Sequence, residues 1–317
     1  MTNNTCPVCQ RVQWSATTQS CSDYLTQHSF QVQACQCGGC YHTEVSEETD
    51  TDYYGTAYYN SDKGKFSPLV EQIFRWNHRR NADFFYTHFN PRKVLEIGCG
   101  RAYILQALKA KGCEVYCVES SQAAEWILAN STVIGLDDAQ LAKYPQESFD
   151  LIIIWHVLEH LPDPVSSLQR AHHLLTEQGN LCISVPNRSS FQARLTQCCW
   201  FHLDVPRHLF HFTREGLQQM LAAQGYEVTA VRSGGILQNL YGWWQSLANL
   251  FTPKTPNVLY RFLQGGNAWR NNLQYAALII QILSAVIWLP VGLLGYILEE
   301  ITGNYGTVTM FARKRGK

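Results

Sequence analysis

Short apolar runs alternate with amphipathic stretches along most of this 317-residue chain. Residues 151–155 are wholly apolar, as expected of a strand that is buried on both faces. The segments predicted as strands are residues 93–97, 114–118, 132–135, 150–155, 180–185, 225–231 and 306–313. Strands that alternate with helices form a parallel sheet with helices on both faces. The pattern therefore predicts an α/β fold with a doubly wound, Rossmann-like sheet and ligands at the carboxyl ends of its strands.

The first predicted core strand ends in a glycine turn. Residues 94–100 read Val-Leu-Glu-Ile-Gly-Cys-Gly, and a helix-compatible segment follows. Glycines let the backbone approach a ligand closely, and free N–H groups at a helix start favour a polar or anionic group. Glu119 ends the next strand, where a carboxylate can accept both hydroxyls of a ribose. The two features together predict a nucleoside-containing cofactor.

The turn differs from the dinucleotide-binding fingerprint, because Tyr103 stands at its third glycine position. The chain instead resembles the class I S-adenosylmethionine (SAM)-dependent methyltransferases, in their ubiquinone-methyltransferase-like branch. Residues 94–102 look like the first motif of that family, residues 148–164 like its fourth-strand segment and residues 179–187 like its fifth strand. The resemblance covers about residues 66–231 and 306–314. One departure is Ala102, which stands where the family usually has glycine, so we expect altered cofactor affinity rather than its loss.

The resemblance implies a seven-stranded methyltransferase sheet and SAM as the cofactor. Adenine is expected near the end of the third strand, although an acidic turn is the alternative interpretation of Asp137. Residues 41–66 are rich in tyrosine, and form either a surface loop or a linker over the cofactor mouth. The residues expected at the cofactor are Glu96, Gly98, Cys99, Gly100, Glu119, Ser120, Leu136, Asp137, Trp155 and His156.

Three histidines are candidates for the general base that methyl transfer to oxygen requires: His156, His160 and His208. Imidazole suits this role because its ordinary pKa lies near neutrality. Glu159 is expected to orient one of them or to cap local structure. Arg207 is a candidate to hold an anionic group of the substrate bidentately. A packing role is the alternative for His160 and for His211.

Six of the twelve cysteines fall in the first forty residues. Cys6 and Cys9 form one C-x-x-C pair, Cys37 and Cys40 form a second, and 27 residues separate the pairs. Two such pairs can bring four thiolates to one tetrahedral zinc ion. We therefore expect a structural Zn²⁺ site, with Cys35 as an alternative to Cys37. Further candidate ligands are Cys21, His28 and His42, and a loose arm with free thiols is the alternative interpretation.

Composition narrows the function further. Lys+Arg and Asp+Glu both number 25, so the chain carries no net charge that would attract nucleic acid. Its first residues are polar and lack an apolar signal-peptide core. Twelve cysteines without such a signal indicate a reducing compartment, so a cytoplasmic location is expected.

Residues 232–305 separate the last two predicted strands and are far longer than a hairpin needs. Residues 276–298 contain no charged side chain and would reach about 34 Å as a helix, enough to cross a bilayer. However, a single crossing cannot return the chain to the same sheet, and Pro290 interrupts the run. We therefore expect two short helices in a re-entrant or interfacial wedge on a membrane, with a buried interface as the alternative.

The sequence thus predicts four segments. They are a Cys-rich zinc segment (1–45), an aromatic linker with a helical cap (46–90), a methyltransferase core (91–231 plus 306–314) and a hydrophobic helical insertion (232–305). The expected activity is SAM-dependent O-methylation of a small-molecule, lipid-linked, isoprenoid or sugar-type acceptor. The alternative is a non-catalytic binding or scaffold protein that kept the fold.

Overall fold

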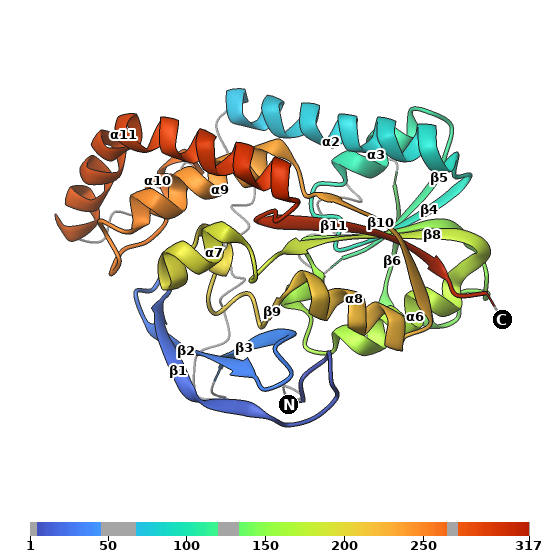
Figure 1. The fold of residues 1–317 in the computed structure, drawn as a ribbon. Coiled ribbons are helices and arrows are strands. Elements are labelled where there is room, and N and C mark those ends of the chain that lie inside the picture. The colour runs from blue at the N-terminus through green and yellow to red at the C-terminus, as the bar shows by residue number, and fades with distance from the viewer. Residues whose placement is uncertain (1–4, 46–67, 120–132, 265–271, 317) are drawn as a thin grey trace.

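The computed structural model describes residues 5–45, 68–119, 133–264 and 272–316 (Figure 1). Its strands are β1 Trp14–Ser22, β2 Ser29–Cys35, β3 Cys40–Glu44, β4 Lys93–Ile97, β5 Glu114–Val118, β6 Ile134–Leu136, β7 Phe149–Trp155, β8 Leu175–Pro186, β9 Phe210–Phe212, β10 Tyr226–Ser233 and β11 Thr307–Lys314. Its α-helices are α2 Pro68–Phe89, α3 Tyr103–Lys109, α5 Asp138–Ala142, α6 Pro164–Leu174, α7 Phe191–Thr196, α8 Arg214–Ala223, α9 Ile236–Asn249, α10 Val258–Leu263 and α11 Asn272–Thr302. Three 3₁₀ helices join them: η2 Leu158–His160, η3 Gln197–Cys199 and η4 Phe201–Leu203.

A seven-stranded sheet with the order β10-β11-β8-β7-β4-β5-β6 forms the core. The pairs from β8 to β6 are parallel, whereas β11 runs antiparallel to both of its neighbours. Helices α2 and α3 lie on one side of this sheet, and α6 and α8 on the other (Figure 1). The predicted doubly wound α/β fold is confirmed, and the predicted strands match the observed ones to within a few residues.

The central strand β7 is buried on both faces. Leu151 and Ile153 pack in one hydrophobic cluster, Ile152 and Ile154 in another, and all four are 0% exposed. Successive side chains of a strand point to opposite faces, so one apolar run supplies both layers. Complete burial of each such side chain stabilises the fold by roughly 1.5–3 kcal/mol, which explains why the run contains no polar residue.

The N-terminal region forms a second sheet with the order β1-β2-β3-β9. Its last strand comes from the core segment, and Cys40 pairs there with Phe212. Gly216 of α8 lies so close to Gly39 that no Cβ would fit between them. The Cys-rich segment is therefore tied to the core by strand pairing, which the sequence did not predict.

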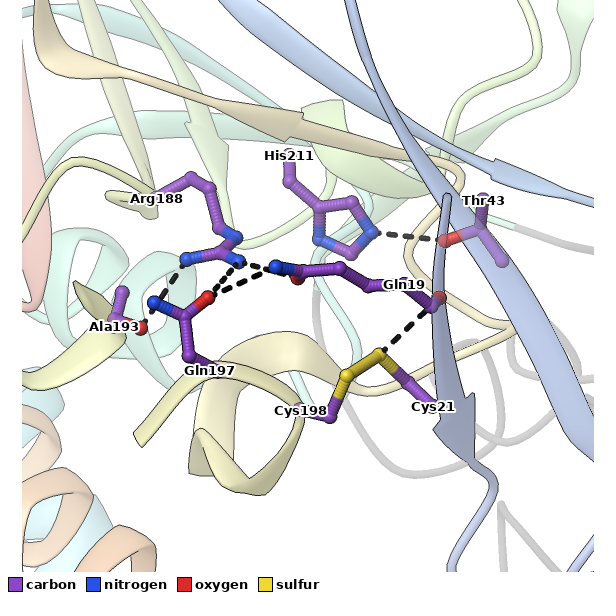
Figure 2. The surroundings of a disulfide bond; sticks show 8 residues. All are labelled: Gln19, Cys21, Thr43, Arg188, Ala193, Gln197, Cys198 and His211. Carbon is purple, nitrogen blue, oxygen red and sulfur yellow. Dashed lines mark hydrogen bonds between the residues drawn. A yellow bond between two sulfur atoms is a disulfide. The ribbon is translucent and has the colours of Figure 1, made fainter. Parts of the chain in front are cut away.

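A disulfide joins Cys21 of β1 to Cys198 of η3, 177 residues away in the chain (Figure 2). The idea that Cys21 is an additional zinc ligand was therefore wrong, because its sulfur is already bonded. The reducing compartment inferred from the sequence predicts that all cysteines are free thiols. The disulfide differs from that prediction as well.

The insertion before β11 contains α9, α10 and α11, and α11 packs against both of the others. Helix α11 is bent by 63° between its parts Leu273–Ser284 and Val286–Thr302. Pro290 lacks an N–H and its ring meets the carbonyl group four residues earlier, so a bend beside Val286 follows from it. The expected break in the apolar run is present, one turn before the proline.

No helix in the described part of the chain has by itself the length and apolarity for a bilayer span, although the two parts of α11 reach that limit together. One side of α11 packs on α9, where the buried Gln281 accepts from Gln245 Nε2 (3.1 Å) and donates to Asn249 Oδ1 (3.3 Å). The opposite side exposes large apolar residues, among them Leu283, Val286, Ile287 and Leu294, each 65–79% exposed.

Glu299 anchors the end of α11 to the core. Its fully buried carboxyl group accepts a hydrogen bond from Gln192 of α7 (2.9 Å). Burial raises the pKa of Glu299 from 4.5 to about 7. The folded protein therefore holds a proton between pH 4.5 and 7 that the unfolded chain releases, so folding stability falls as pH rises through this window.

Glu299→Gln should remove this loss of folding stability at higher pH, because the amide does not titrate and its oxygen can still accept a hydrogen bond from Gln192. We expect the variant to match the parent near pH 4.5 and to be more stable by up to about 3 kcal/mol above pH 7. Urea unfolding at pH 5 and pH 8 measures the difference. Glu300→Gln, an exposed neighbour, is the control, and equal gains in both variants would refute the assignment.

Candidate functional site

The turn after β4 holds three residues in the left-handed region: Gly98 (φ 72°), Gly100 (φ 53°) and Ala102 (φ 54°). The Gly98 N–H donates to the Val118 carbonyl (2.7 Å), which ties the turn to the end of β5. A Cβ at Gly98 would collide with the side chain of Val157, whereas a Cβ at Gly100 would meet nothing within 4 Å. Gly100 therefore presents its backbone to open space.

Ala102 precedes α3 and is fully buried. A left-handed conformation costs an L-residue with a Cβ roughly 1–2 kcal/mol, which explains why glycine is common at such a position. Ala102 nevertheless adopts the left-handed conformation directly before α3.

Two carboxyl groups flank the turn. Glu119 accepts a hydrogen bond from the Gly100 N–H through Oε2 (2.7 Å), so the acidic residue at the end of β5 lies at the mouth of the turn. Glu96 of β4 is 4% exposed, and its Oε2 has no hydrogen-bond partner among the described residues. Burial raises the pKa of Glu96 well above its usual range, and Cys117 and Glu119 add to this.

The other expected cofactor residues are placed differently. The side chain of Cys99 is buried in a hydrophobic cluster, so only its backbone faces the turn. Asp137 caps α5, because its Oδ1 accepts from the Gln140 N–H (2.6 Å), and Leu136 ends β6 beside it. Ser120 and the tyrosine-rich linker with Tyr53 lie outside the described residues.

A buried carboxylate lies among the candidate histidines. Glu159 is 1% exposed, and its Oε1 is 3.5 Å from His156 Nδ1 and 3.9 Å from His208 Nε2. His156 directly follows β7 with φ 55°, and its N–H donates to the Ser184 carbonyl. His156 Nε2 is buried without a hydrogen-bond partner in the described part of the chain. Neither carboxyl oxygen of Glu159 has a hydrogen-bond partner among the described residues, so its orienting role stays a prediction.

The remaining histidines contact the backbone. His160 Nδ1 pairs with the Arg207 carbonyl (2.9 Å) and His208 Nδ1 with the His202 carbonyl (2.9 Å). Burial lowers the pKa of His208 well below its usual range, and neighbouring histidines lower it further. His211 contacts Thr43 Oγ1 (2.8 Å), and burial lowers its pKa to about 3, which fits the alternative packing role.

Arg207 does not face a substrate site. Its side chain is 1% exposed, pairs with Asp23 Oδ1 (2.8 Å) and Asp204, and lies over the ring of Tyr24. The expectation that it holds a substrate anion was wrong, because two carboxylates already neutralise its charge. Asp23 lies 184 residues away in sequence, so the sequence pattern gave no sign of the pairing.

Two groups of side chains could hold a metal ion. The first is Glu159, His160 and His208, whose ligand atoms lie within 4.8 Å of one another. The second is Cys6, Cys9, Cys35 and Cys37, with sulfur separations of 3.8 Å between Cys6 and Cys37 and 3.6 Å between Cys9 and Cys35.

The cysteine group fits tetrahedral zinc, because Zn–S bonds of about 2.3 Å place the sulfurs about 3.8 Å apart. Cys35 takes the place of the predicted Cys40, whose thiol donates to the Tyr41 carbonyl (3.3 Å). The side chain of Cys40 is nevertheless the main cause that lowers the pKa of Cys6 to about 5. A thiolate is the form that binds a metal.

A cavity of about 370 Å³ adjoins the end of β7. Trp155 forms one wall with Phe84 and Phe85 of α2, while Tyr296 and Glu300 of α11 form another. The Trp155 indole N–H has no hydrogen-bond partner among the described residues. This mixed apolar and polar lining is typical of small-molecule sites. The sequence did not predict that the insertion helps to line it.

A family model described as a methyltransferase domain matches residues 69–231, just over half of the chain. Ubiquinone biosynthesis O-methyltransferase from Pseudomonas aeruginosa is 28% identical over 109 residues, which cover 31% of this chain and 46% of that protein. The enzyme of the same name from Pseudomonas syringae is 28% identical over 156 residues, covering 41% and 66%. The chain thus spans about half to two thirds of the length of these relatives.

Among solved structures, a putative sarcosine dimethylglycine methyltransferase from Galdieria sulphuraria is 14% identical, with a TM-score of 0.49. The alignment covers 83% of this chain and 97% of that one. The family match over the glycine turn and the seven-stranded sheet confirm the resemblance seen in the sequence. The chain therefore belongs to the class I S-adenosylmethionine-dependent methyltransferases.

Proposed function

We propose that the protein transfers a methyl group from SAM to a hydroxyl oxygen of a small molecule. The observation that carries this proposal is the Glu119 carboxylate, held by the Gly100 N–H at the mouth of a left-handed glycine turn. The open space beside Gly100 and the unpartnered Oε2 of Glu96 suit a bound nucleoside. Glu119 would accept the ribose hydroxyls, and the residues after β6 would contact adenine.

When bound, SAM supplies an electrophilic methyl group on a sulfonium, so the protein must mainly position the acceptor and remove its proton. His156 is the proposed base. Its Nε2 would take the hydroxyl proton while the oxygen bonds to the methyl carbon and the methyl–sulfur bond breaks. Glu159 would orient the ring through Nδ1 and stabilise the imidazolium that forms. His208 suits this role less well, because its lowered pKa makes it a weak base.

The cavity beside Trp155 is the proposed acceptor site. Because Tyr296 and Glu300 belong to α11, the helix that carries the exposed apolar surface also walls this cavity. This connection favours a lipid-linked or isoprenoid acceptor, reached from a membrane surface on which α11 lies. A sugar-type acceptor is the alternative, and the polar side chains of Arg80 and Arg232 in the same lining are consistent with it.

Cofactor binding can be tested with Glu119→Ala. The change removes hydrogen bonds to the ribose, each worth about 1–3 kcal/mol, so SAM affinity should fall at least tenfold. Calorimetric titration with SAM, and separately with NAD, measures it in the parent and the variant. Glu177→Ala, an exposed acid at the start of β8, is the matched control. Unchanged SAM affinity would remove Glu119 from the site, and binding of neither nucleotide by the folded parent would favour the scaffold alternative.

The catalytic proposal predicts that His156→Gln lowers turnover by about 10²–10⁴-fold, with SAM affinity retained. Glu159→Gln should lower it less, since the variant keeps the base and loses only the carboxylate that orients the ring and stabilises the imidazolium. Formation of S-adenosylhomocysteine with a panel of phenolic, isoprenoid and sugar acceptors gives the rate. His208→Gln is the comparison: if its turnover falls and that of His156→Gln does not, His208 is the base. Inhibition by EDTA would indicate instead that Glu159, His160 and His208 hold a cation.

We further propose a structural zinc ion on Cys6, Cys9, Cys35 and Cys37. Elemental analysis of the purified protein should find one equivalent of zinc, and Cys35→Ser should lose it because three thiolates bind zinc less tightly. Cys40→Ser should keep the metal. The reverse result would restore Cys40 to the ligand set, and a zinc-free parent protein would reject the site.

Membrane attachment predicts that the protein co-sediments with vesicles of anionic phospholipid. Leu283→Glu with Val286→Glu should reduce this binding by tenfold or more, since two exposed side chains lose roughly 1.5–3 kcal/mol of burial each. Leu195→Glu on α7, where the leucine is 61% exposed, is the control. Equal binding of all three proteins would exclude α11 as the membrane-contacting surface.

A further inference from the structure

A second cavity, of about 540 Å³, lies where the N-terminal sheet meets α7 and α8. We call it the Arg188 cavity, and its lining includes Gln19, Gly39, Arg188, Arg194, Gln197 and Glu215. None of these residues belongs to the glycine turn, to the histidine cluster or to the cavity beside Trp155. The proposed methyl transfer therefore leaves this cavity without a role.

Arg188 is buried with its guanidinium over the ring of Tyr41, but with no opposite charge beside it among the described residues. Its side chain is 4% exposed and donates to three neutral acceptors: the Ala193 carbonyl (3.2 Å), Gln19 Oε1 (3.1 Å) and Gln197 Oε1 (3.3 Å). Figure 2 shows these acceptors around the guanidinium. Its Nε has no hydrogen-bond partner among the described residues.

No carboxylate in the described ranges forms an ion pair with Arg188. The contrast with Arg207 is direct, since that guanidinium is equally buried but binds two carboxylates. A buried charge without an opposite charge is costly. Burial accordingly lowers the pKa of Arg188. An anion in the cavity would remove this cost.

The rest of the lining adds positive charge and hydrogen-bonding groups. Arg194 contributes a second guanidinium from the exposed side of α7, and Ser189 contributes a hydroxyl group. Glu215 is the single acid in the lining and is exposed. The two guanidinium groups therefore outnumber the carboxylates of the lining, to which Cys37 of the proposed zinc site also belongs.

The walls of the cavity are also held in place before any ligand binds. Gln19 lies two residues before Cys21, and Gln197 directly precedes Cys198, so the disulfide joins the two segments that contact Arg188 (Figure 2). Gln19 Nε2 also donates to Gln197 Oε1 (3.1 Å). A preorganised site loses less conformational entropy on binding.

We propose that the Arg188 cavity binds a small molecule through an oxyanion, which the guanidinium groups of Arg188 and Arg194 hold. Guanidinium presents a planar fork of donors that matches the oxygen spacing of both phosphate and carboxylate. The volume accommodates more than a single ion, so the oxyanion would belong to a larger metabolite.

Calorimetric titration of the full-length protein with inorganic phosphate, and separately with malonate, tests the proposal. Binding of either probe supports it, and the tighter probe identifies a phosphate or a carboxylate ligand. Arg194→Gln should weaken binding about tenfold, whereas Glu215→Gln should strengthen it severalfold because a repelling charge is lost. Both positions are exposed, so these variants should fold normally.

Arg92→Gln is the control, because Arg92 is exposed and lies at the amino end of β4, whereas Arg188 follows the carboxyl end of β8. This variant should leave binding unchanged. Arg188→Gln should abolish binding, and circular dichroism checks that this variant is folded. If it does not fold, the variants at the exposed positions Arg194 and Glu215 still test the proposal. Absence of binding by both probes, or equal affinity in the Arg194, Glu215 and Arg92 variants, would overturn the proposal.

Discussion

The parallel pairing of β4 with both β5 and β7 is the constraint on which the site depends. It brings three strand ends to one edge: the glycine turn after β4, Glu119 after β5 and His156 after β7. Two contacts across these strands fix the edge, the Gly98 N–H with the Val118 carbonyl and the packing of Val157 against Gly98. Because β7 is buried on both faces, a shift in its register would disturb the packing of both layers and displace His156 at the same time. The packing of the core therefore also determines the geometry of the site.

The parts of the molecule that the sequence predicted are those that local patterns determine. Apolar runs locate the strands, and Gly98, Gly100 and Glu119 follow from the turn and from the end of the next strand. The sequence could not predict contacts between distant segments. Asp23 neutralises Arg207, Cys198 bonds to Cys21, and β9 completes the N-terminal sheet. None of these pairs has a spacing that a motif could reveal, and two of them changed the assignment of a candidate residue.

The apolar stretch of the insertion has one side that packs inside the protein and another that is exposed. One side of α11 packs on α9 through polar contacts, which Gln281 makes with Gln245 and Asn249 from inside a largely apolar run. The other side exposes Val286 and its neighbours. A composition window cannot separate these sides, because it averages around the helix axis. The bend beside Val286 further changes the direction of the exposed side, so residues 276–298 are not equivalent to one straight apolar helix.

The pairing of β3 with β9 has a consequence for how the chain is made. Strands β1 to β3 are made before β9, yet their sheet is incomplete until residues 210–212 follow. During that interval the edge of β3 has unpaired backbone groups, which can pair with another chain. Contacts at such sequence separation also form slowly. The cysteine-rich segment therefore reaches its final structure only after β9 has been made, and nascent chains that stall before residue 210 are the form most exposed to misassembly.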